Sequence, residues 1–389
     1  MIFRKDKDVI YFDNAATTWP KPRAVTEAVK RSLSDPFGNP GRGSHKAAAS
    51  AAKTVYELRE EAAELFGADP LNVVLTSSAT QGLNFAIKGA ARKGCTILFS
   101  DLEHNSVRRP VLSLRDSGYC HTDIYGSHGG DNERIISDLI AKIEPGNCVV
   151  VANYASNVCN LTLPVSQIGE ICKKTGSVFI VDASQSAGHF NVDVEKMNIS
   201  VLCMPGHKGL YGPMGTGLMV FSKSAAESIS SFSTLIEGGS GVDSEDTGMP
   251  SVLPERFEPG TVNAHGVAGL LAGIQWVKRT GTARIRKNEN RLWLDLYERT
   301  SCSDRITVYG DGTPGAIFPF NIKGVPPSEV GRLLDEKGIC VRTGLHCSPL
   351  AHKTLGTGED GAVRISFGFF NTLRETEEAA DRILKIAKQ

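Results

Sequence analysis

Short apolar runs rich in β-branched residues alternate with segments of helical periodicity through the first half of the chain. These runs are residues 73–76, 95–100, 148–152 and 177–181. Continuous apolar runs of this length are typical of strands that are buried on both faces. Between the last two runs, residues 164–175 carry apolar side chains at helical spacing. The alternation predicts an α/β fold in which helices wrap a mainly parallel sheet.

Two amphipathic helices stand out by their periodicity and their end signals. Residues 47–66 repeat apolar side chains every three or four positions and are followed by Gly67, a common helix stop. Near the end of the chain, Thr372 and Glu375 form a capping-box pattern that opens a second helix. Both segments are therefore predicted to pack one face on a core.

The character of the sequence changes near Gly281, where helical segments begin to mix with short strands such as 338–342 and 362–366. This change predicts a second, smaller α+β domain. The expected boundaries are 14–275 for a large domain and, for the small domain, 1–13 together with 276–389.

The charge balance of the 389 residues excludes several classes of partner. The chain has 43 basic and 43 acidic side chains, so its formal net charge is zero, and it gives no electrostatic footprint for nucleic acid or an anionic membrane. Hydrophobic residues make up 41% and charged residues 22%, which is ordinary globular composition. No apolar run approaches the roughly 20 residues that span a bilayer.

The nine cysteines are scattered along the chain without a regular spacing. The N-terminal segment is charged where a signal peptide would be apolar, so we expect a cytoplasmic protein with reduced thiols rather than a disulfide framework. Most of these cysteines are then expected to be small buried side chains.

Asp182 and Lys208 are the first candidates for chemistry. Asp182 follows the run 177–181, so its carboxylate is expected at the carboxyl edge of the sheet, where α/β folds bind ligands. Lys208 lies between Gly206 and Gly209, on backbone that can approach a ligand closely. A carboxylate for a ring nitrogen and a Schiff-base lysine are what pyridoxal phosphate requires. The two residues also fit a strand-end turn and a surface lysine, and spacing alone favours this structural interpretation.

Six motifs occur in a fixed order along nearly the whole chain. They are Asp13-Asn14-Ala15-Ala16-Thr17-Thr18, Glu103-His104-Asn105, Val181-Asp182-Ala183-Ser184-Gln185, Gly206-His207-Lys208, Arg342-Thr343-Gly344-Leu345-His346-Cys347 and Asn371-Thr372. Together they resemble the class V aminotransferase-like enzymes, in particular the cysteine desulfurases and selenocysteine lyases. The resemblance implies pyridoxal 5'-phosphate (PLP) as cofactor and fold type I of the PLP-dependent transferases.

The resemblance also implies roles for matching residues. Lys208 corresponds to the lysine that binds the cofactor covalently, Asp182 to the partner of the ring nitrogen, and His104 to the histidine that stacks on the ring. The other implied cofactor contacts are Thr80, Ala79, His207, Gln185, Asn157 and Thr261. The implied substrate contacts are Arg364, which matches the arginine for the α-carboxylate, Asn157 and Arg342. For Thr80 there is an independent reason, because residues 77–82 join a strand to a helix and helix N-termini attract phosphate.

Comparison with the same family shows one residue that departs from its pattern, and it implies one contact between subunits. Much of the family has a serine three residues before the lysine, but this chain has Pro205, which lacks a hydroxyl and an amide hydrogen, so a phosphate contact is lost or replaced. Thr261 resembles a threonine that the neighbouring subunit donates to the phosphate, which implies a homodimer. Arg42 and His45 are further candidates to reach a site across that dimer.

Cys347 is the candidate nucleophile among the cysteines. It lies in a loop between the flexible Gly344 and Pro349, and the nearby Arg342 and His346 would favour the nucleophilic thiolate. A zinc site is the alternative, with potential ligands Cys340, His346, Cys347 and His352. Their spacing differs from the short regular pairs that zinc sites favour.

The resemblance therefore implies a PLP-dependent cysteine desulfurase. Its substrate would be L-cysteine, its product L-alanine, and its sulfur would pass as a Cys347 persulfide to an acceptor protein. Selenocysteine lyase activity is one alternative. A same-fold aminotransferase, lyase or epimerase is another, and a noncatalytic sulfur-delivery protein is a third.

Overall fold

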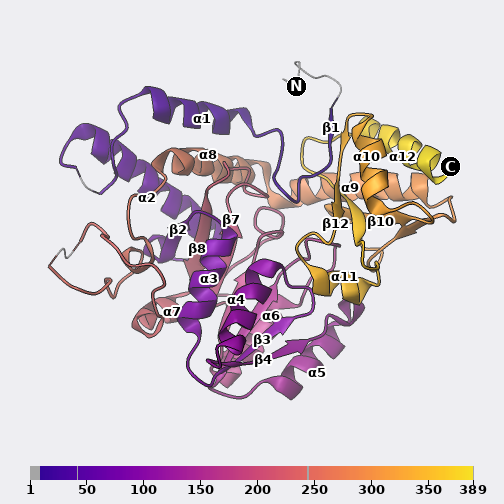
Figure 1. Cartoon of the computed structure of the whole chain (residues 1–389). Helices are drawn as coiled ribbons and strands as arrows, with labels where there is room; N and C mark the ends of the chain where they lie inside the picture. Colours follow the sequence, from indigo (N-terminus) through magenta and orange to yellow (C-terminus); the bar gives the residue numbers. More distant parts are fainter. Residues whose placement is uncertain (1–8, 42, 243–244, 389) are drawn as a thin grey trace. The chain divides into compact units, whose positions relative to one another are not determined.

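A computed structural model describes residues 9–41, 43–242 and 245–388 (Figure 1). Contacts divide the chain into two compact units. Unit 1 contains the described residues up to Pro20, Ser156–Leu161 and the described residues from Ala283 onward; unit 2 contains the described residues of Lys21–Ala155 and Thr162–Thr282. Within the described ranges, every helix is too short or too polar to cross a lipid bilayer.

Unit 2 is built on a seven-stranded sheet within the described part of the chain. The strands, in spatial order, are β2 (Val73–Thr76), β8 (Gly217–Phe221), β7 (Val201–Pro205), β6 (Val178–Asp182), β5 (Cys148–Asn153), β3 (Thr96–Ser100) and β4 (His121–Tyr125). β8 pairs antiparallel with both of its neighbours, and the other pairs are parallel. Because β5, β7 and β8 are buried at every position, the apolar runs fill both faces, as their sequence predicted.

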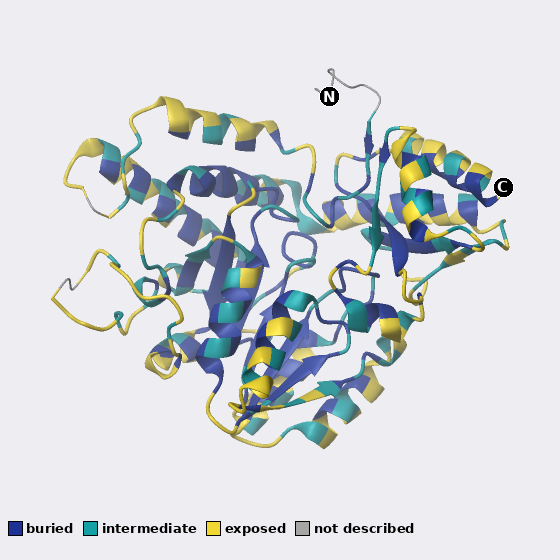
Figure 2. Cartoon of the chain, in the orientation of Figure 1, coloured by how far each residue is buried: buried dark blue, intermediate teal, exposed yellow. Residues whose placement is uncertain are grey.

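Helices surround this sheet in unit 2. They are α1 (Arg23–Ser34), α2 (Lys46–Phe66), α3 (Ala79–Ala90), α4 (Asn105–Asp116), α5 (Asn132–Lys142), α6 (Val165–Thr175), α7 (Lys223–Glu227) and α8 (Ala264–Thr280). The predicted helix 47–66 is confirmed as α2, which ends at Gly67 in the left-handed conformation. Figure 2 shows buried strands inside and exposed outer faces on the helices. The predicted α/β fold with a mainly parallel sheet is confirmed.

Unit 1 is an α+β structure with its own core. Its antiparallel sheet has the order β12 (Arg342–Gly344), β13 (Ala362–Ser366), β10 (Ile317–Ile322) and β9 (Ile306–Val308), and β1 (Ile10–Tyr11) pairs parallel with β11 (Ile339–Cys340). The helices are α9 (Thr282–Thr300), α10 (Pro327–Asp335), α11 (Pro349–Leu355) and α12 (Leu373–Ala387). Aromatic side chains, among them Phe12, Trp293 and Phe318, pack with aliphatic ones in the core. The Thr372–Glu375 capping box at α12 is confirmed.

Two features of unit 1 differ from the expectation. The single strand expected over 338–342 is two short strands, because β11 pairs with β1 whereas β12 pairs with β13. The segment 156–161 belongs to unit 1, although the sequence placed it inside the large domain. There the Asn160 side chain bonds both backbone groups of Ile317, at 2.8 and 3.0 Å. These pairings connect residues far apart in the sequence, which local periodicity does not encode.

Candidate active site

Asp182 is the last residue of β6 in unit 2, at the carboxyl edge of the parallel sheet. Its side chain is only 4% exposed, and its Oδ1 accepts a hydrogen bond from the Ser184 amide at 2.8 Å. Gln185 follows one residue later and is half-buried. The strand ends where its apolar run ends, so the polar side chains that come next lie at the edge where α/β sheets bind ligands.

Lys208 lies in the loop after β7, residues 206–209, which we call the lysine loop. A Cβ on Gly188 would lie 2.1 Å from the carbonyl oxygen of Gly209, and a Cβ on Gly209 would lie 2.2 Å from that of Ala187. Backbone therefore touches backbone where the lysine loop meets the turn that follows Asp182. The two residues that spacing alone left ambiguous are on adjoining turns of one sheet edge.

Lys21 makes a further contact with the lysine loop. Its Nζ donates to the carbonyl oxygen of His207 at 2.7 Å. Burial lowers the pKa of Lys21 to about 8. Burial, together with the charges of Lys208 and Lys21, lowers the pKa of His207 to about 4, so this imidazole is neutral at pH 7. The sequence gave no reason to single out Lys21, because its partner lies far away along the chain.

His104, Ser106 and Thr80 form a chain of hydrogen bonds. His104 caps α4, and its Nδ1 accepts from the Ser106 amide at 3.0 Å, so the hydroxyl of Ser106, at 2.7 Å, also donates to that nitrogen. The Ser106 oxygen then accepts from Thr80 Oγ1 at 2.9 Å. Thr80 and Ala79 lie in the first turn of α3, where backbone amides have no acceptor within the helix. The sequence did not predict a role for Ser106, which joins the predicted site residues His104 and Thr80.

Glu103 is buried under this site. One carboxyl oxygen accepts from Ser100 Oγ and from the Asn153 amide, both at 2.7 Å. Burial above all, against the lowering effect of the Ser100 hydrogen bond and with a smaller contribution from the Asp182 charge, raises the pKa of Glu103 to about 8. Glu103 is therefore mostly protonated at pH 7. The sequence placed it in a motif beside His104 without giving it a role.

The donors in unit 2 fit PLP. The buried carboxylate of Asp182 lies at the end of β6, and Lys208 lies on the adjoining lysine loop. The first turn of α3 offers backbone amides that have no acceptor within the helix, together with the Thr80 hydroxyl. These groups suit a ring nitrogen, an aldehyde and a phosphate in turn. The individual cofactor roles stay predictions.

Thr261 is exposed on unit 2 and lines a cavity of about 230 Å³ together with Ser77 and Gln81. Its segment is held by Glu258, which forms a buried ion pair with Arg59 at 2.7 Å. A donation by Thr261 to a neighbouring subunit stays a prediction. Of the other cross-dimer candidates, Arg42 lies outside the described residues, and His45 caps α2 by accepting from the Ala48 amide at 3.3 Å.

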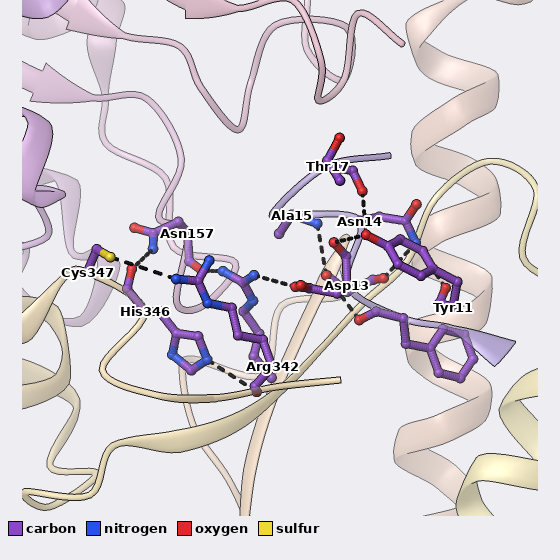
Figure 3. A network of polar contacts seen from close by, with 12 residues as sticks. Tyr11, Asp13, Asn14, Ala15, Thr17, Asn157, Arg342, His346 and Cys347 are labelled. Atoms are coloured by element: carbon purple, nitrogen blue, oxygen red, sulfur yellow. Dashed lines mark hydrogen bonds and ion pairs between the residues drawn. The ribbon is translucent and has the colours of Figure 1, made fainter. Parts of the chain in front are cut away.

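Cys347 lies in unit 1 in the loop of residues 345–348, which we call the thiol loop. Nη2 of Arg342 donates to its sulfur at 3.7 Å (Figure 3). His346 and Cys347 both have left-handed backbones, with φ of 49° and 59°. Non-glycine residues adopt this conformation only where the surroundings hold them there. The sulfur is exposed and faces a guanidinium group.

Asn157 provides one such restraint on the thiol loop. Its Nδ2 donates to the His346 carbonyl at 2.9 Å (Figure 3). Its Oδ1 accepts from Ser348 Oγ at 2.7 Å. Both polar ends of this amide are thus bonded within unit 1. The roles expected for Asn157 toward cofactor and substrate stay predictions, whereas its contact with the thiol loop was not foreseen.

Arg364, on β13, is the most buried cation among the predicted site residues, with 1% of its surface exposed. Its Nη1 donates to the Asn157 carbonyl at 2.9 Å and its Nη2 to Asp13 Oδ1 at 2.8 Å. Each of these nitrogens carries a second hydrogen, which is the pattern that a planar carboxylate accepts. The chemistry fits a carboxylate site, and Asp13 is its unforeseen partner.

His346 does not supply the positive charge that the sequence suggested. Burial above all, and then the charge of Arg364, lowers its pKa to about 2, so its ring is neutral and Arg342 is the cation that contacts Cys347. His346 Nδ1 and His352 Nε2 lie 3.0 Å apart and bond each other. Within the described residues no group of three His, Cys, Asp or Glu side chains is placed to hold a metal ion.

The cysteines divide by exposure. Six are buried, Cys340 is half-buried, and Cys302 and Cys347 are exposed. All nine are free thiols. Exposure alone does not separate Cys347 from Cys302, but the Cys302 thiol donates to a backbone carbonyl whereas Arg342 donates to the Cys347 sulfur. The guanidinium contact makes Cys347 the candidate nucleophile.

The chain is similar to known proteins over nearly its full length. The aminotransferase class-V family model matches residues 10–378. A probable cysteine desulfurase of Methanothermobacter thermautotrophicus is 33% identical over 100% of this chain and 99% of its own length. A probable cysteine desulfurase of Pyrococcus abyssi is 32% identical over 96% of this chain and 94% of its own.

Solved structures show the same similarity. The apo structure of a cysteine desulfurase from Thermococcus onnurineus has a TM-score of 0.89 and 31% identity, covering 98% of this chain and 95% of that one. A cysteine desulfurase from Escherichia coli has a TM-score of 0.86 at 24% identity, over 98% and 95% of the two chains, and shows the shared fold.

Proposed function

Because the chain belongs to the aminotransferase class-V family, we propose that it is a PLP-dependent cysteine desulfurase. It removes sulfur from L-cysteine, releases L-alanine and keeps the sulfur as a persulfide on Cys347. The observation that carries this proposal is the exposed Cys347 sulfur 3.7 Å from Nη2 of Arg342. A transaminase needs no such thiol. A relative at 33% identity over the full chain that is named a probable cysteine desulfurase supports the same activity.

Unit 2 holds the cofactor in this proposal. Asp182 would bind the ring nitrogen, the first turn of α3 and Thr80 would bind the phosphate, and Lys208 would hold the cofactor covalently. When bound, PLP withdraws electrons from the substrate α-carbon. Lys208 Nζ would then carry the α-proton, a role supported by its position on the turn that adjoins the one after Asp182. The neutral Glu103 and His207 add no charge beside Asp182 at pH 7.

Unit 1 provides the residues that bind the substrate carboxylate and accept its sulfur. Arg364 binds the α-carboxylate through its remaining Nη hydrogens. The Cys347 sulfur bonds to the substrate sulfur as the carbon–sulfur bond of the substrate breaks, and the bonding electron pair stays with the carbon, which is protonated to give alanine. The exposure of Cys347 leaves its persulfide open to an acceptor protein.

Three further statements belong to this proposal. The sulfur acceptor is a thiol-bearing protein, because a persulfide passes its sulfur to another thiolate. The working form is a homodimer, because Thr261 resembles a threonine that the neighbouring subunit donates to the phosphate. The compartment is the cytoplasm, where a reducing environment regenerates the Cys347 thiol after each turnover.

The test is product analysis with purified protein, PLP, L-cysteine and a thiol reductant. The proposal predicts equal amounts of alanine and sulfide, and none from Lys208→Ala. L-Selenocysteine in a parallel reaction measures the preference between the two substrates. Amino-group transfer to a keto acid without sulfide would overturn the proposal.

A further inference from the structure

A buried chain of hydrogen bonds lies behind the thiol loop. His352 Nδ1 contacts Thr357 Oγ1 at 2.7 Å, His352 Nε2 contacts His346 Nδ1 at 3.0 Å, and His346 Nε2 contacts the Arg342 carbonyl at 3.3 Å. We call these three side chains, of Thr357, His352 and His346, the histidine chain. Their exposed fractions are 7%, 1% and 4%. Figure 3 shows its last link, from the His346 ring to Arg342.

The protons of the histidine chain can be assigned from its final acceptor. A backbone carbonyl only accepts, so His346 Nε2 carries a hydrogen and donates to Arg342. In a neutral ring His346 Nδ1 is then an acceptor, and His352 Nε2 must donate to it. His352 Nδ1 is in turn an acceptor, so the Thr357 hydroxyl donates to it. The donors thus run in one direction, from Thr357 to Arg342.

Burial keeps both rings neutral and so preserves that direction. Burial, and next the Arg364 charge, lowers the pKa of His352 to about 4, and the same two causes lead the lowering for His346. Arg342 and Arg364 are the charged groups that act on His346. A second proton on His346 would point a donor at the donor of His352. Near pH 7 the histidine chain therefore keeps this direction of donors.

The histidine chain ends on the two groups that present the sulfur. His346 directly precedes Cys347, and both residues have positive φ. The His346 ring also fixes the backbone of Arg342, whose guanidinium donates to the Cys347 sulfur. The His346 ring thus restrains the thiol loop, to which His346 belongs. It also restrains Arg342, whose guanidinium faces the thiol.

We propose that His352 and Thr357 are positioning residues for Cys347: they fix the His346 ring as a donor to Arg342 and so keep the Arg342 guanidinium against the sulfur. The effect of this positioning on catalysis rests on the proposed function. The positioning itself can be tested without turnover. A pair of ordinary core histidines would tolerate the loss of the Thr357 hydroxyl, because shape and volume would be kept.

Thr357→Val and Thr357→Ser form a matched pair for the test. Valine keeps the shape and removes the donor, whereas serine keeps the donor. With valine, His352 is free to place its hydrogen on Nδ1, and the His346 ring then loses its fixed direction. The first readout is the rate at which iodoacetamide labels Cys347 in the cofactor-free protein, measured by peptide mass spectrometry against the exposed Cys302 in the same chain.

We expect Thr357→Val to slow Cys347 labelling several-fold without changing Cys302, and Thr357→Ser to match the wild type. In the loaded enzyme we expect kcat to fall about tenfold in Thr357→Val with KM for L-cysteine unchanged. Equal labelling of Cys347 in the two variants would overturn the inference. Absence of alanine and sulfide from the wild type would instead overturn the proposed function and leave the labelling result standing.

A second measurement needs no variant. Nitrogen-15 NMR of the histidine side chains in the wild-type protein should show His346 neutral with its hydrogen on Nε2 and His352 with its hydrogen on Nε2. A hydrogen on Nδ1 of His346 would contradict the assigned direction and overturn the inference, even if Thr357→Val fails to fold.

Discussion

The carboxylate of Asp13 lies 2.8 Å from Nη2 of Arg364 and is the acidic partner of the most buried cation among the predicted site residues. A buried guanidinium without a counter-charge is costly, because the charge has left water and nothing replaces that solvation. The pair also fixes the plane of the guanidinium and thereby the direction in which its other hydrogens point.

Asp13→Asn keeps the shape of the side chain and removes its charge. We expect the free energy of unfolding to fall by about 2 kcal/mol, the range for hydrogen bonds to charged groups. Urea unfolding measures this change. Asp381→Asn, on the exposed face of α12, is the matched control and should leave stability within about 0.5 kcal/mol. Equal stability of the two variants would show that Arg364 does not depend on Asp13.

The raised pKa of Glu103 predicts that the free energy of unfolding depends on pH. Its pKa is raised from 4.5 to about 8, so the folded state holds the proton more tightly than the unfolded chain does. Its contribution to stability is fully present below pH 4.5 and is lost as pH rises toward 8. Glu103→Gln cannot titrate, so the wild type should lose stability relative to this variant between pH 5 and 8, by at most about 1.4 kcal/mol per pH unit.

Urea unfolding of the wild type and Glu103→Gln at several pH values measures that difference. The histidines titrate alike in both proteins, so their effects cancel. The exposed Glu359→Gln serves as the control for the Glu-to-Gln substitution itself, measured at the same pH values. A difference between the wild type and Glu103→Gln that does not change with pH would mean that Glu103 is ionised in the folded protein at neutral pH.

Gly188 tests the contact between the lysine loop and the turn after Asp182. Its φ is 87°, and a Cβ there would lie 2.1 Å from the Gly209 carbonyl oxygen. Gly188→Ala should cost about 3 kcal/mol or more, since both the backbone conformation and the space oppose it. Gly118 has a φ of 71° but nothing within 4 Å of its Cβ position, so Gly118→Ala reports the backbone cost alone.

Thermal and urea unfolding of these two glycine variants separate crowding from backbone strain. If Gly188→Ala is no less stable than Gly118→Ala, the lysine loop does not pack against the turn after Asp182 as described. PLP absorbance of the folded variants then shows whether the lysine loop still holds its place.

The elements that the sequence predicts well are those whose signal is local. β2, β3, β5 and β6 coincide with apolar runs, because a strand buried on both faces must be apolar throughout. The ends of α2 and α12 follow from Gly67 and the Thr372–Glu375 box, which act within one helical turn. Asp182 was placed at the sheet edge by the same reasoning.

The features of the fold and of the site that the sequence did not predict depend on contacts between segments far apart in the chain. Lys21 reaches the carbonyl of His207, and Asn157 reaches the thiol loop, across 186 and 189 residues of sequence. The neutral charge state of His346 depends on burial, which its position beside Cys347 did not reveal. Helical and strand periodicity carry no information about such pairs, so only the folded chain identifies them.

The most direct test of the central claim is the mass of the peptide that contains Cys347. The PLP-loaded protein is mixed with L-cysteine without reductant, alkylated and digested. The account predicts one added sulfur atom on the Cys347 peptide, one alanine released for each sulfur retained, and neither in Lys208→Ala. Sulfur retained on a different cysteine, or full sulfide release by Cys347→Ser, would contradict the account.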